Sequence, residues 1–395
     1  MSNFIDDAAV VPPKRTRTTR PKTHLYCVID AGRSRIKFQA RTSTRSTPVM
    51  TLDSLVCPVE SLPYGERGAF SMARTVDDQH NEIVEHWVVG SSARFQGKDF
   101  VTMTERADHK VAYFPVLALG AIASLPYLEE FSTGTHKSKR TLHIHLSTLS
   151  LASPRTLHSA IEQCRWIVVD GVKYRLSFSR AGCVGFPEGY GAALFTQQRL
   201  REVDVATHTF YTFDIGFGTA TLTEYDNLGS LPKRGMCNPH GGGGIVTLLR
   251  VFAEQLSTVD AARVMRPSQI KDILETSTLD DQGGIHAYTA EGHDIGDVLS
   301  VAIRQWMKDS PLTYALETLA TSGRRHPVTL CGGGFAIAPV RMLVRDYLRQ
   351  AGIPNEHILI PEDPGTIALA EMHHLFSSPP PKDSLHEARH TTDAA

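Results

Sequence analysis

Alternating apolar and polar positions in the first part of the chain predict β-strands. The opening run covers residues 25–41 and is interrupted by a tight turn after Asp30, so it predicts a hairpin. Apolar residues also recur with a period near two at 49–56 and at 83–93. The pattern therefore predicts that the fold starts as a meander of short strands.

The following segments switch between the helical and the strand period. Residues 111–128 are apolar and rich in Ala, which predicts a buried helix. Residues 141–151 alternate as a strand, 154–164 predict a short helix, and 165–179 predict a second hairpin. Helices and strands are thus mixed through the first half of the chain.

The second half repeats the opening pattern. Residues 209–225 predict a strand, a turn and another strand, and residues 238–256 contain four glycines followed by a regular apolar helix. Residues 296–320 predict one long amphipathic helix whose large apolar side chains belong to the core. Residues 358–376 predict a short strand, a Pro-rich turn and a last helix.

Two of these predicted hairpins share one order of residues. Residues 27–38 (CVIDAGRSRIKF) and 210–225 (FYTFDIGFGTATLTEY) each contain an apolar strand that ends in Asp, one small or apolar residue, Gly and a tight turn. Glycine lets the backbone approach a phosphate, and a carboxylate can organise Mg²⁺. One such turn is ordinary in hairpins, but two suggest that two halves of the protein clamp one nucleotide.

Other glycine-rich turns agree with this hypothesis. Residues 326–352 predict a strand, a turn of three glycines and an amphipathic helix, so a flat ring or a ribose could lie against the bare backbone. The four glycines within 238–256 indicate either a further close approach to the nucleotide at a helix N-terminus or a mobile loop.

Glu188 is a candidate for the chemistry, because it lies between apolar residues and the start of a helix rich in small residues. Two interpretations are open from the residues alone. Glu188 either occupies a helix N-terminus, where a negative charge is favourable by ~0.3 to 1 kcal/mol, or it acts in the site.

Composition narrows the class of protein. The 395 residues, 41% of them apolar, suffice for two domains of ordinary size. The chain has 41 Lys and Arg against 42 Asp and Glu, so we expect no direct sequence-specific contact with nucleic acid. Six cysteines without a C-x-x-C pair argue against a zinc site and a disulfide framework. No apolar run approaches the ~20 residues of a transmembrane segment, so the sequence predicts a soluble, cytoplasmic protein.

The two ends of the chain differ from the rest. Residues 1–23 combine prolines with lysines and arginines and predict a disordered basic arm. That arm is either a solvated tail or a contact for DNA, acidic lipid or a neighbouring subunit. Residues 377–395 predict a disordered tail.

In chain order, the two hairpins and the strand with three glycines match the phosphate-1, phosphate-2 and adenosine motifs of the actin-like, sugar kinase and DnaK-type ATPases. The chain therefore resembles an actin-like ATPase. Within that superfamily it is most similar to the ParM/StbA group of bacterial plasmid-partition filaments, because residues 29–39 have the order Ile-Asp-x-Gly-x-x-x-Ile-Lys. The departures are Arg33 and Arg35 in the first turn, which either contact phosphate, pair with acids or face solvent, and Phe217 in the second.

The resemblance covers about residues 25–376 and implies an α/β protein with a two-domain actin-like (ribonuclease-H-like) ATPase fold and the nucleotide in the interdomain cleft. Domain I is expected at 24–190, with 340–376 returning to it. Domain II is expected at 191–339.

The resemblance also implies the site. ATP is the expected nucleotide, with GTP as the alternative, together with Mg²⁺ that Asp30 and Asp214 hold through water. Glu188 would orient the attacking water, which makes Glu188 and Asp214 the expected catalytic residues. Lys37 would either reach a phosphate oxygen or point to solvent. The expected nucleotide-binding residues are Asp30, Gly32, Arg33, Ser34, Lys37, Gly216, Gly218, Thr219, Gly243, Gly244, Gly332, Gly333 and Gly334.

The function implied by the resemblance is an ATPase that polymerises into dynamic cytoskeletal filaments. Such a filament would segregate plasmid DNA through a small DNA-binding adaptor, or would control cell shape at the cell cortex through a membrane-linking adaptor. Two alternatives are a sugar or acetate-type kinase of the same fold and a non-hydrolysing actin-like scaffold.

Overall fold

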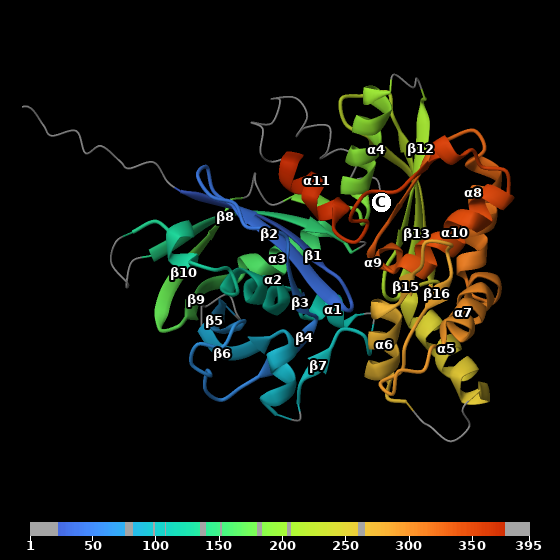
Figure 1. Cartoon of the computed structure of the whole chain (residues 1–395). Coiled ribbons are helices and arrows are strands. Elements are labelled where there is room, and N and C mark those ends of the chain that lie inside the picture. The colour runs from blue at the N-terminus through green and yellow to red at the C-terminus, as the bar shows by residue number, and fades with distance from the viewer. Residues whose placement is uncertain are drawn as a thin grey trace, which may run out of the picture.

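Two β-sheets, each covered by its own helices, form two halves that lie side by side (Figure 1). The computed structural model describes residues 23–75, 82–97, 99–106, 108–134, 140–150, 152–179, 184–203, 207–259 and 265–375. The predicted arm at 1–23, except Thr23, and the predicted tail at 377–395 lie outside these residues. No helix in the described ranges has the length and apolar character that crossing a membrane requires.

The first half is built on a large mixed sheet with the strand order β3-β2-β1-β8-β10-β9-β5-β6-β4-β7, in which β11 also pairs with β8. Its strands are β1 (His24–Ala31), β2 (Arg35–Arg41), β3 (Met50–Asp53), β4 (Leu55–Pro58), β5 (Ala69–Thr75), β6 (Glu82–Val89), β7 (Val101–Thr102), β8 (Arg140–Leu149), β9 (Cys164–Val169), β10 (Val172–Phe178) and β11 (Val184–Phe186). Its helices are η1 (Ser91–Phe95), α1 (His109–Ala112), α2 (Phe114–Ala123), η2 (Leu128–Phe131) and α3 (Pro154–Glu162). The predicted opening hairpin and the helix at 154–164 are confirmed.

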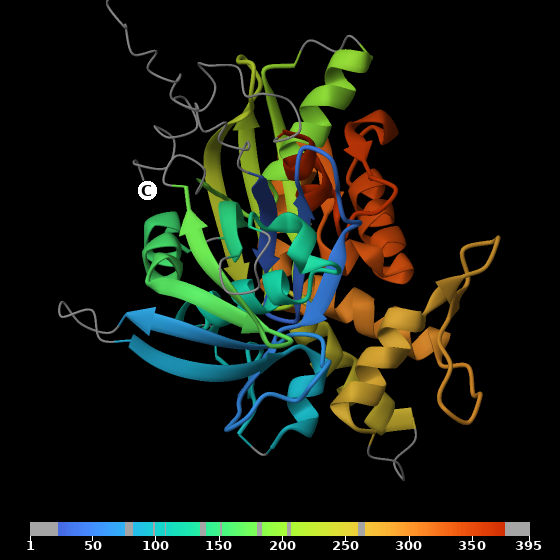
Figure 2. The same cartoon turned by 90° about the vertical axis from the view of Figure 1, so that its left-hand side faces the viewer.

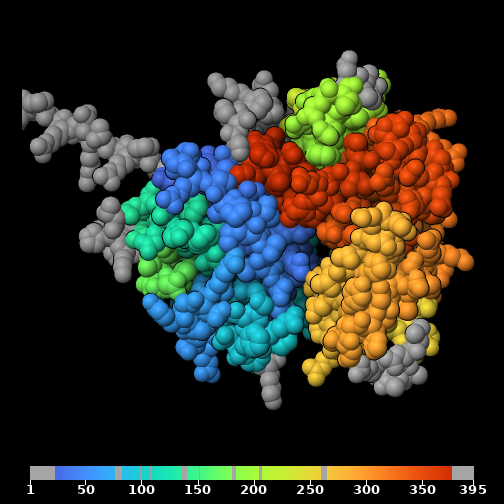
Figure 3. Space-filling model, in the orientation of Figure 1, coloured from blue at the N-terminus to red at the C-terminus, as the bar shows by residue number. Residues whose placement is uncertain are grey.

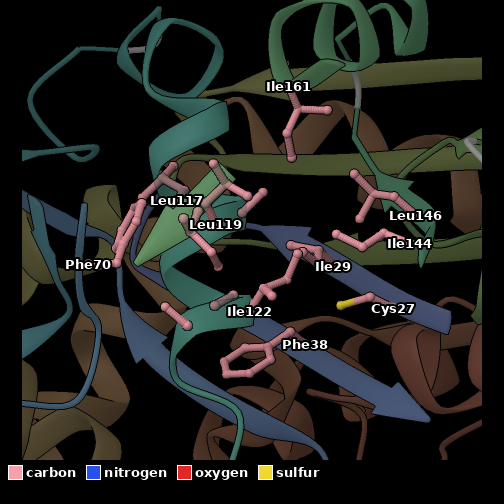
Figure 4. Packing of buried hydrophobic residues seen from close by; sticks show 14 of the residues in the cluster. Cys27, Ile29, Phe38, Phe70, Leu117, Leu119, Ile122, Ile144, Leu146 and Ile161 are labelled. Atoms are coloured by element: carbon pink, nitrogen blue, oxygen red, sulfur yellow. The ribbon is translucent and has the colours of Figure 1, made fainter. Parts of the chain in front are cut away.

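Helix α2 is the centre of the first core. All ten of its residues are buried, as its uninterrupted apolar sequence predicts. Leu117, Leu119 and Ile122 pack among side chains of the surrounding strands, such as Ile29 and Phe38 (Figure 4). Such burial contributes roughly 1.5 to 3 kcal/mol for each large apolar side chain, so this helix fixes the strands that lead to the cavity described below.

The second half contains a five-stranded sheet with the order β14-β13-β12-β17-β18. Its strands are β12 (Thr209–Ile215), β13 (Thr219–Asp226), β14 (Lys233–Gly241), β17 (Val328–Cys331) and β18 (Ile358–Leu359), with a separate pair, β15 (Thr278–Leu279) and β16 (Ile285–His286). Its helices are α5 (Ile245–Val259), α6 (Pro267–Thr276), α7 (Gly296–Asp309), α8 (Leu312–Ser322), α9 (Gly333–Ala336), α10 (Ala338–Gln350) and η4 (Asn355–His357). The β15–β16 hairpin stands out from this half, in gold in Figure 2.

The single helix predicted at 296–320 is wrong, because the structure has two helices there. Helix α7 ends at Asp309 and α8 begins at Leu312. Pro311 lies between them and has no N–H to continue the helical hydrogen bonds of α7. The buried Trp306 still belongs to the core, as the pattern predicts.

Helices α4 (Tyr190–Glu202) and α11 (Ile367–Leu375) cross between the two sheets. They share a small core with both halves, which includes Val28 of β1 and Phe210 of β12. At Gly191 the crossing is so close that a Cβ atom would lie 1.8 Å from the carbonyl oxygen of Ala368. The two helices therefore join the halves through direct backbone contact.

The return of the chain to the first half starts later than the expected residue 340. Helix α10 buries Val340, Leu343 and Val344 in the second core, and β18 pairs with β17 of the second sheet. In the described part of the chain after residue 340, α11 is the helix that packs against β1 and β2. The boundary at 340 is wrong because the apolar face of α10 matches the second core.

Candidate active site between the two halves

Four strand ends meet where the two halves face each other. In the first half β1 runs parallel to β8, which places Asp30 opposite Leu149. In the second half β12 runs parallel to β17, which places Asp214 opposite Cys331. Each half thus presents an Asp at the carboxyl end of its central strand, and each Asp is followed by a hairpin turn. We call residues 32–34 the first turn and residues 216–218 the second turn.

A cavity of about 590 Å³ lies between these strand ends. This volume is within the range of small-molecule and cofactor sites in proteins. The space-filling view shows the blue and cyan residues of the first half meeting the orange residues of the second along one line (Figure 3). The sequence-predicted residues that line the cavity are Asp30, Gly32, Arg33, Ser34, Lys37, Glu188, Asp214, Gly216, Gly218, Thr219, Gly332, Gly333 and Gly334.

Gly243 and Gly244 are not among the lining residues, although they were expected to contact the nucleotide. A Cβ atom at Gly244 would lie 2.5 Å from the backbone nitrogen of Thr219, so this glycine packs against the back of the second turn. The first amides of α5 are already occupied, because Ile245 and Val246 donate to the carbonyls of Gly216 and Phe217 at 3.1 and 2.8 Å. Gly244 and the start of α5 therefore support the second turn from behind, while Gly243 packs against Ala220 and Leu312.

Charged side chains of both signs converge in the cavity. Lys110 Nζ donates to Glu188 Oε1 at 2.5 Å. Lys37 Nζ lies 4.0 Å from Asp30 Oδ2 and donates to the carbonyl of Gly365 at 2.6 Å. Lys37 therefore lies inside the cavity and does not point to solvent.

The environment changes the protonation of both aspartates. Burial, followed by the negative charge of Glu188, raises the pKa of Asp214 from 3.8 to about 7. Burial also raises the pKa of Asp30, although Lys37 and Lys110 partly offset the shift. Burial lowers the pKa of Lys110, but the carboxylates, Glu188 first, outweigh it, so the net shift is upward. The aspartates therefore lie where an additional positive charge would be favourable.

The two unusual arginines of the first turn have different partners. Arg35 Nη2 forms an ion pair at 2.8 Å with Glu275 Oε2 on α6, so this contact spans the mouth of the cavity. Arg33 donates from Nε and Nη2 to the carbonyls of Met103 and Thr104 at 3.3 and 2.7 Å. The sequence left three alternatives for these arginines: contact with phosphate, pairing with an acid, or exposure to solvent. In the structure Arg35 pairs with an acid, while Arg33 donates hydrogen bonds to backbone carbonyls.

Glycine is required at Gly332 for steric reasons, whereas an added Cβ atom at Gly218 would meet only the flexible side chain of an arginine. Gly332 has a φ of 94°, and a Cβ atom there would lie 2.2 Å from Asp214 Oδ1. A Cβ atom at Gly218 would lie 2.4 Å from Arg33 Nη1, across the boundary between the halves. Gly333 has no atom within 4 Å of such a position, so it leaves open space.

Several residues that line the cavity were not predicted from the sequence. Lys110 lies on the short helix α1, just before the apolar helix α2, and its sequence gave no glycine turn that would point to the cavity. Gly189, Glu275 and residues 363–366 gave no signal, because only the folded chain brings them to the cavity. Asp363 accepts hydrogen bonds from Gly365 N and Thr366 Oγ1 at 3.0 and 2.7 Å and so shapes the loop before α11.

The carboxylate oxygens in the cavity fit a hard divalent cation that is held through water molecules and not by direct ligation. Among the described residues no three His, Cys, Asp or Glu side chains are close enough to hold a metal ion directly. Asp30 and Asp214 nevertheless both line the cavity, and both are partly buried carboxylates with raised pKa values. Oxygen ligands and retained waters are what Mg²⁺ prefers, so the residues fit Mg²⁺ held through water.

Comparisons with known proteins give the fold. No family model matches the chain, and no curated protein matches its sequence. A Bacillus thuringiensis ParM solved with AMPPNP is 10% identical, with a TM-score of 0.59, over 90% of this chain and 99% of that chain. A ParM in a 15-stranded filament from Clostridium botulinum is 15% identical, with a TM-score of 0.58, over 90% and 99%. An archaeal actin homologue is 12% identical, with a TM-score of 0.55, over 90% and 100%.

The chain has an actin-like, ParM-type fold. The two-domain α/β architecture expected from the sequence is confirmed, and the cavity lies between the two halves of this fold. At 10 to 15% identity the likeness describes the fold and leaves the activity to be argued from the site.

Proposed function

We propose that this protein is an ATP hydrolase of the actin type that polymerises into nucleotide-dependent filaments. The observation that carries the proposal is the meeting of the two Asp-ended hairpins and the turn at 332–334 around one cavity. A similar ParM was solved with AMPPNP, an ATP analogue, and another was solved as a filament. Both facts support nucleotide binding and self-association here.

Phosphoryl transfer requires mainly positioning and charge stabilisation. The backbone amides of the first turn and of residues 216–219 would contact the phosphates. Gly333, with its open space, would leave room for the ribose or the base. Mg²⁺, held through water by Asp30 and Asp214, would supply positive charge beside the phosphates.

The bond to be broken joins the terminal phosphorus to its bridging oxygen. The oxygen of a water molecule attacks that phosphorus, and ADP leaves with the bridging oxygen and its electron pair. The proton that the water loses passes to the phosphate produced or to solvent. Glu188 lines the cavity as a carboxylate and would accept a hydrogen bond from this water, which orients it for attack.

Polymerisation would use two different surfaces of the protein. A head-to-tail contact is heterologous, so a chain without internal symmetry can form an open filament. The cellular role would be segregation of plasmid DNA through a small DNA-binding adaptor, or control of cell shape at the cortex through a membrane-linking adaptor. In both cases the filament would work in the cytoplasm.

The proposal is tested by light scattering, pelleting and phosphate release with Mg²⁺ and ATP, a non-hydrolysable analogue, or ADP. We expect polymer with ATP, stable polymer with the analogue and none with ADP. Repeating the series with GTP decides the preferred nucleotide. Asp214→Ala is the matched variant and should lose hydrolysis while keeping its fold.

Two other outcomes would contradict the proposal. Phosphate transfer to a small-molecule acceptor without polymer would favour a sugar or acetate-type kinase of the same fold. Absence of both turnover and ATP-dependent assembly would favour a non-hydrolysing scaffold.

A further inference from the structure

Lys110 carries a partly buried amine that the mechanism above does not yet use. It lies on the four-residue helix α1, and its side chain is only 15% exposed. Its Nζ donates to Glu188 Oε1 at 2.5 Å, across 78 positions of sequence. The short distance and the opposite charges make this a charge-assisted hydrogen bond, which is stronger than a neutral one.

The contact fixes one oxygen of Glu188 and leaves the other available. Within the described residues the structure records a hydrogen bond to Oε1 and none to Oε2. Because a carboxylate has two acceptor oxygens, Oε2 can accept a hydrogen bond from a water in the cavity. Fixing Oε1 therefore also fixes the direction in which Oε2 points.

The segment that carries Lys110 is tied to the first turn. Arg33 holds the carbonyls of Met103 and Thr104, and His109 Nδ1 lies 3.3 Å from the carbonyl of Thr102. The position of Lys110 thus depends on a side chain that extends from the turn expected to bind phosphate. This arrangement gives Arg33 a place in the site without a direct phosphate contact.

We propose that Lys110 is a positioning residue that orients Glu188 toward the attacking water, and that Arg33 couples this orientation to the first turn. The inference rests on the proposed hydrolysis. A buried ion pair that merely stabilises the fold is the competing explanation, and such pairs contribute little to net stability compared with apolar replacements.

Measuring the rate of phosphate release from ATP by the full-length protein and its variants separates the two explanations. Lys110→Met should lower kcat by about 10- to 100-fold with KM changed less than about 3-fold, because misplacing a catalytic group mainly affects the transition state. Lys110→Arg should restore part of the loss, since a guanidinium can still donate to Oε1. A structural role would instead lower the melting temperature and leave kcat near the wild-type value.

A double-mutant cycle supplies the second readout. If Lys110 acts through Glu188, then Lys110→Met combined with Glu188→Gln should be no slower than Glu188→Gln alone. Additive losses would overturn the inference. Arg106→Gln, which removes an exposed positive charge four residues before Lys110, is the control and should hydrolyse at the wild-type rate.

Arg33→Gln tests the coupling. We expect it to lower kcat in the same direction as Lys110→Met, and unchanged kcat would limit the inference to Lys110. Wild-type protein without any phosphate release would contradict the proposed function itself. Active wild-type protein with an unaffected Lys110→Met variant would overturn this inference and leave the proposed function standing.

Discussion

Replacing Asp214 by Asn should stabilise the nucleotide-free protein above pH 7 and abolish its Mg²⁺-dependent hydrolysis. Burial and the charge of Glu188 disfavour the ionised form of Asp214 and raise its pKa from 3.8 to about 7. Asn has nearly the same shape and no charge, so the variant removes the unfavourable ionisation. It also removes a carboxylate that would hold Mg²⁺.

The sign and size of the change in stability follow from the linkage between the protonation of Asp214 and folding. Because the folded-state pKa is raised, Asp214 is most favourable to folding below pH 4, and that contribution is lost as the pH rises to 7. At about 1.4 kcal/mol per pKa unit, a shift of about 3 units sets a ceiling of ~4 kcal/mol. Exchange of water with the cavity reduces this, and we expect about 2 kcal/mol, or roughly 2 to 3 °C in melting temperature for a chain of 395 residues that unfolds as one unit.

The assay is thermal unfolding of wild type and Asp214→Asn between pH 5 and pH 8.5. The difference in melting temperature should already be about a third of its full size at pH 5, because the linkage begins near pH 4, and it should reach its full size by pH 8. Asp309→Asn, at the exposed end of α7, is the control and should show a constant difference across this range. A constant difference for Asp214→Asn, or hydrolysis at the wild-type rate, would refute the reasoning.

Three further predictions concern parts of the chain other than the carboxylates of the cavity. Arg35→Gln breaks the ion pair with Glu275 across the mouth of the cavity and should speed nucleotide dissociation by about 2- to 5-fold at low salt, with the difference lost at 1 M salt in stopped-flow measurements. Gly191→Ala should lower the free energy of unfolding by about 2 kcal/mol because its Cβ would overlap backbone of α11, whereas Gly241→Ala, with open space, should not. Deleting residues 1–23 should leave ATP hydrolysis unchanged, and a large drop would show that the arm takes part in assembly.

The turns of the site could be predicted because local sequence determines them. An apolar strand, Asp and a glycine turn leave little choice of conformation, and the structure places both aspartates at strand ends. The three glycines at 332–334 could be predicted for the same reason, since Gly332 adopts a positive φ.

Features that depend on tertiary contacts could not be predicted in this way. Strand β5 was missed because five consecutive residues from Ala69 are buried, so its sequence does not alternate. The expected return at 340 was wrong because amphipathicity shows that α10 has an apolar face but not which core accepts it. Lys110 and Glu275 reach the cavity from segments whose sequences carry no glycine turn.

Charge balance in the cavity links the stability prediction to the proposed chemistry. Once Asp214 is ionised, the carboxylates of Asp30, Glu188 and Asp214 exceed the ammonium groups of Lys37 and Lys110 by one. The four groups other than Asp214 are the charges that act on its pKa. A triphosphate adds further negative charge, so it would be repelled unless Asp214 keeps its proton or a divalent cation lies beside it. A cation that lets Asp214 ionise also lets phosphates approach, because it offsets the same excess charge. The cavity should therefore bind a nucleoside triphosphate with Mg²⁺ more tightly than the free nucleotide, and the gap should widen as the pH rises above 7.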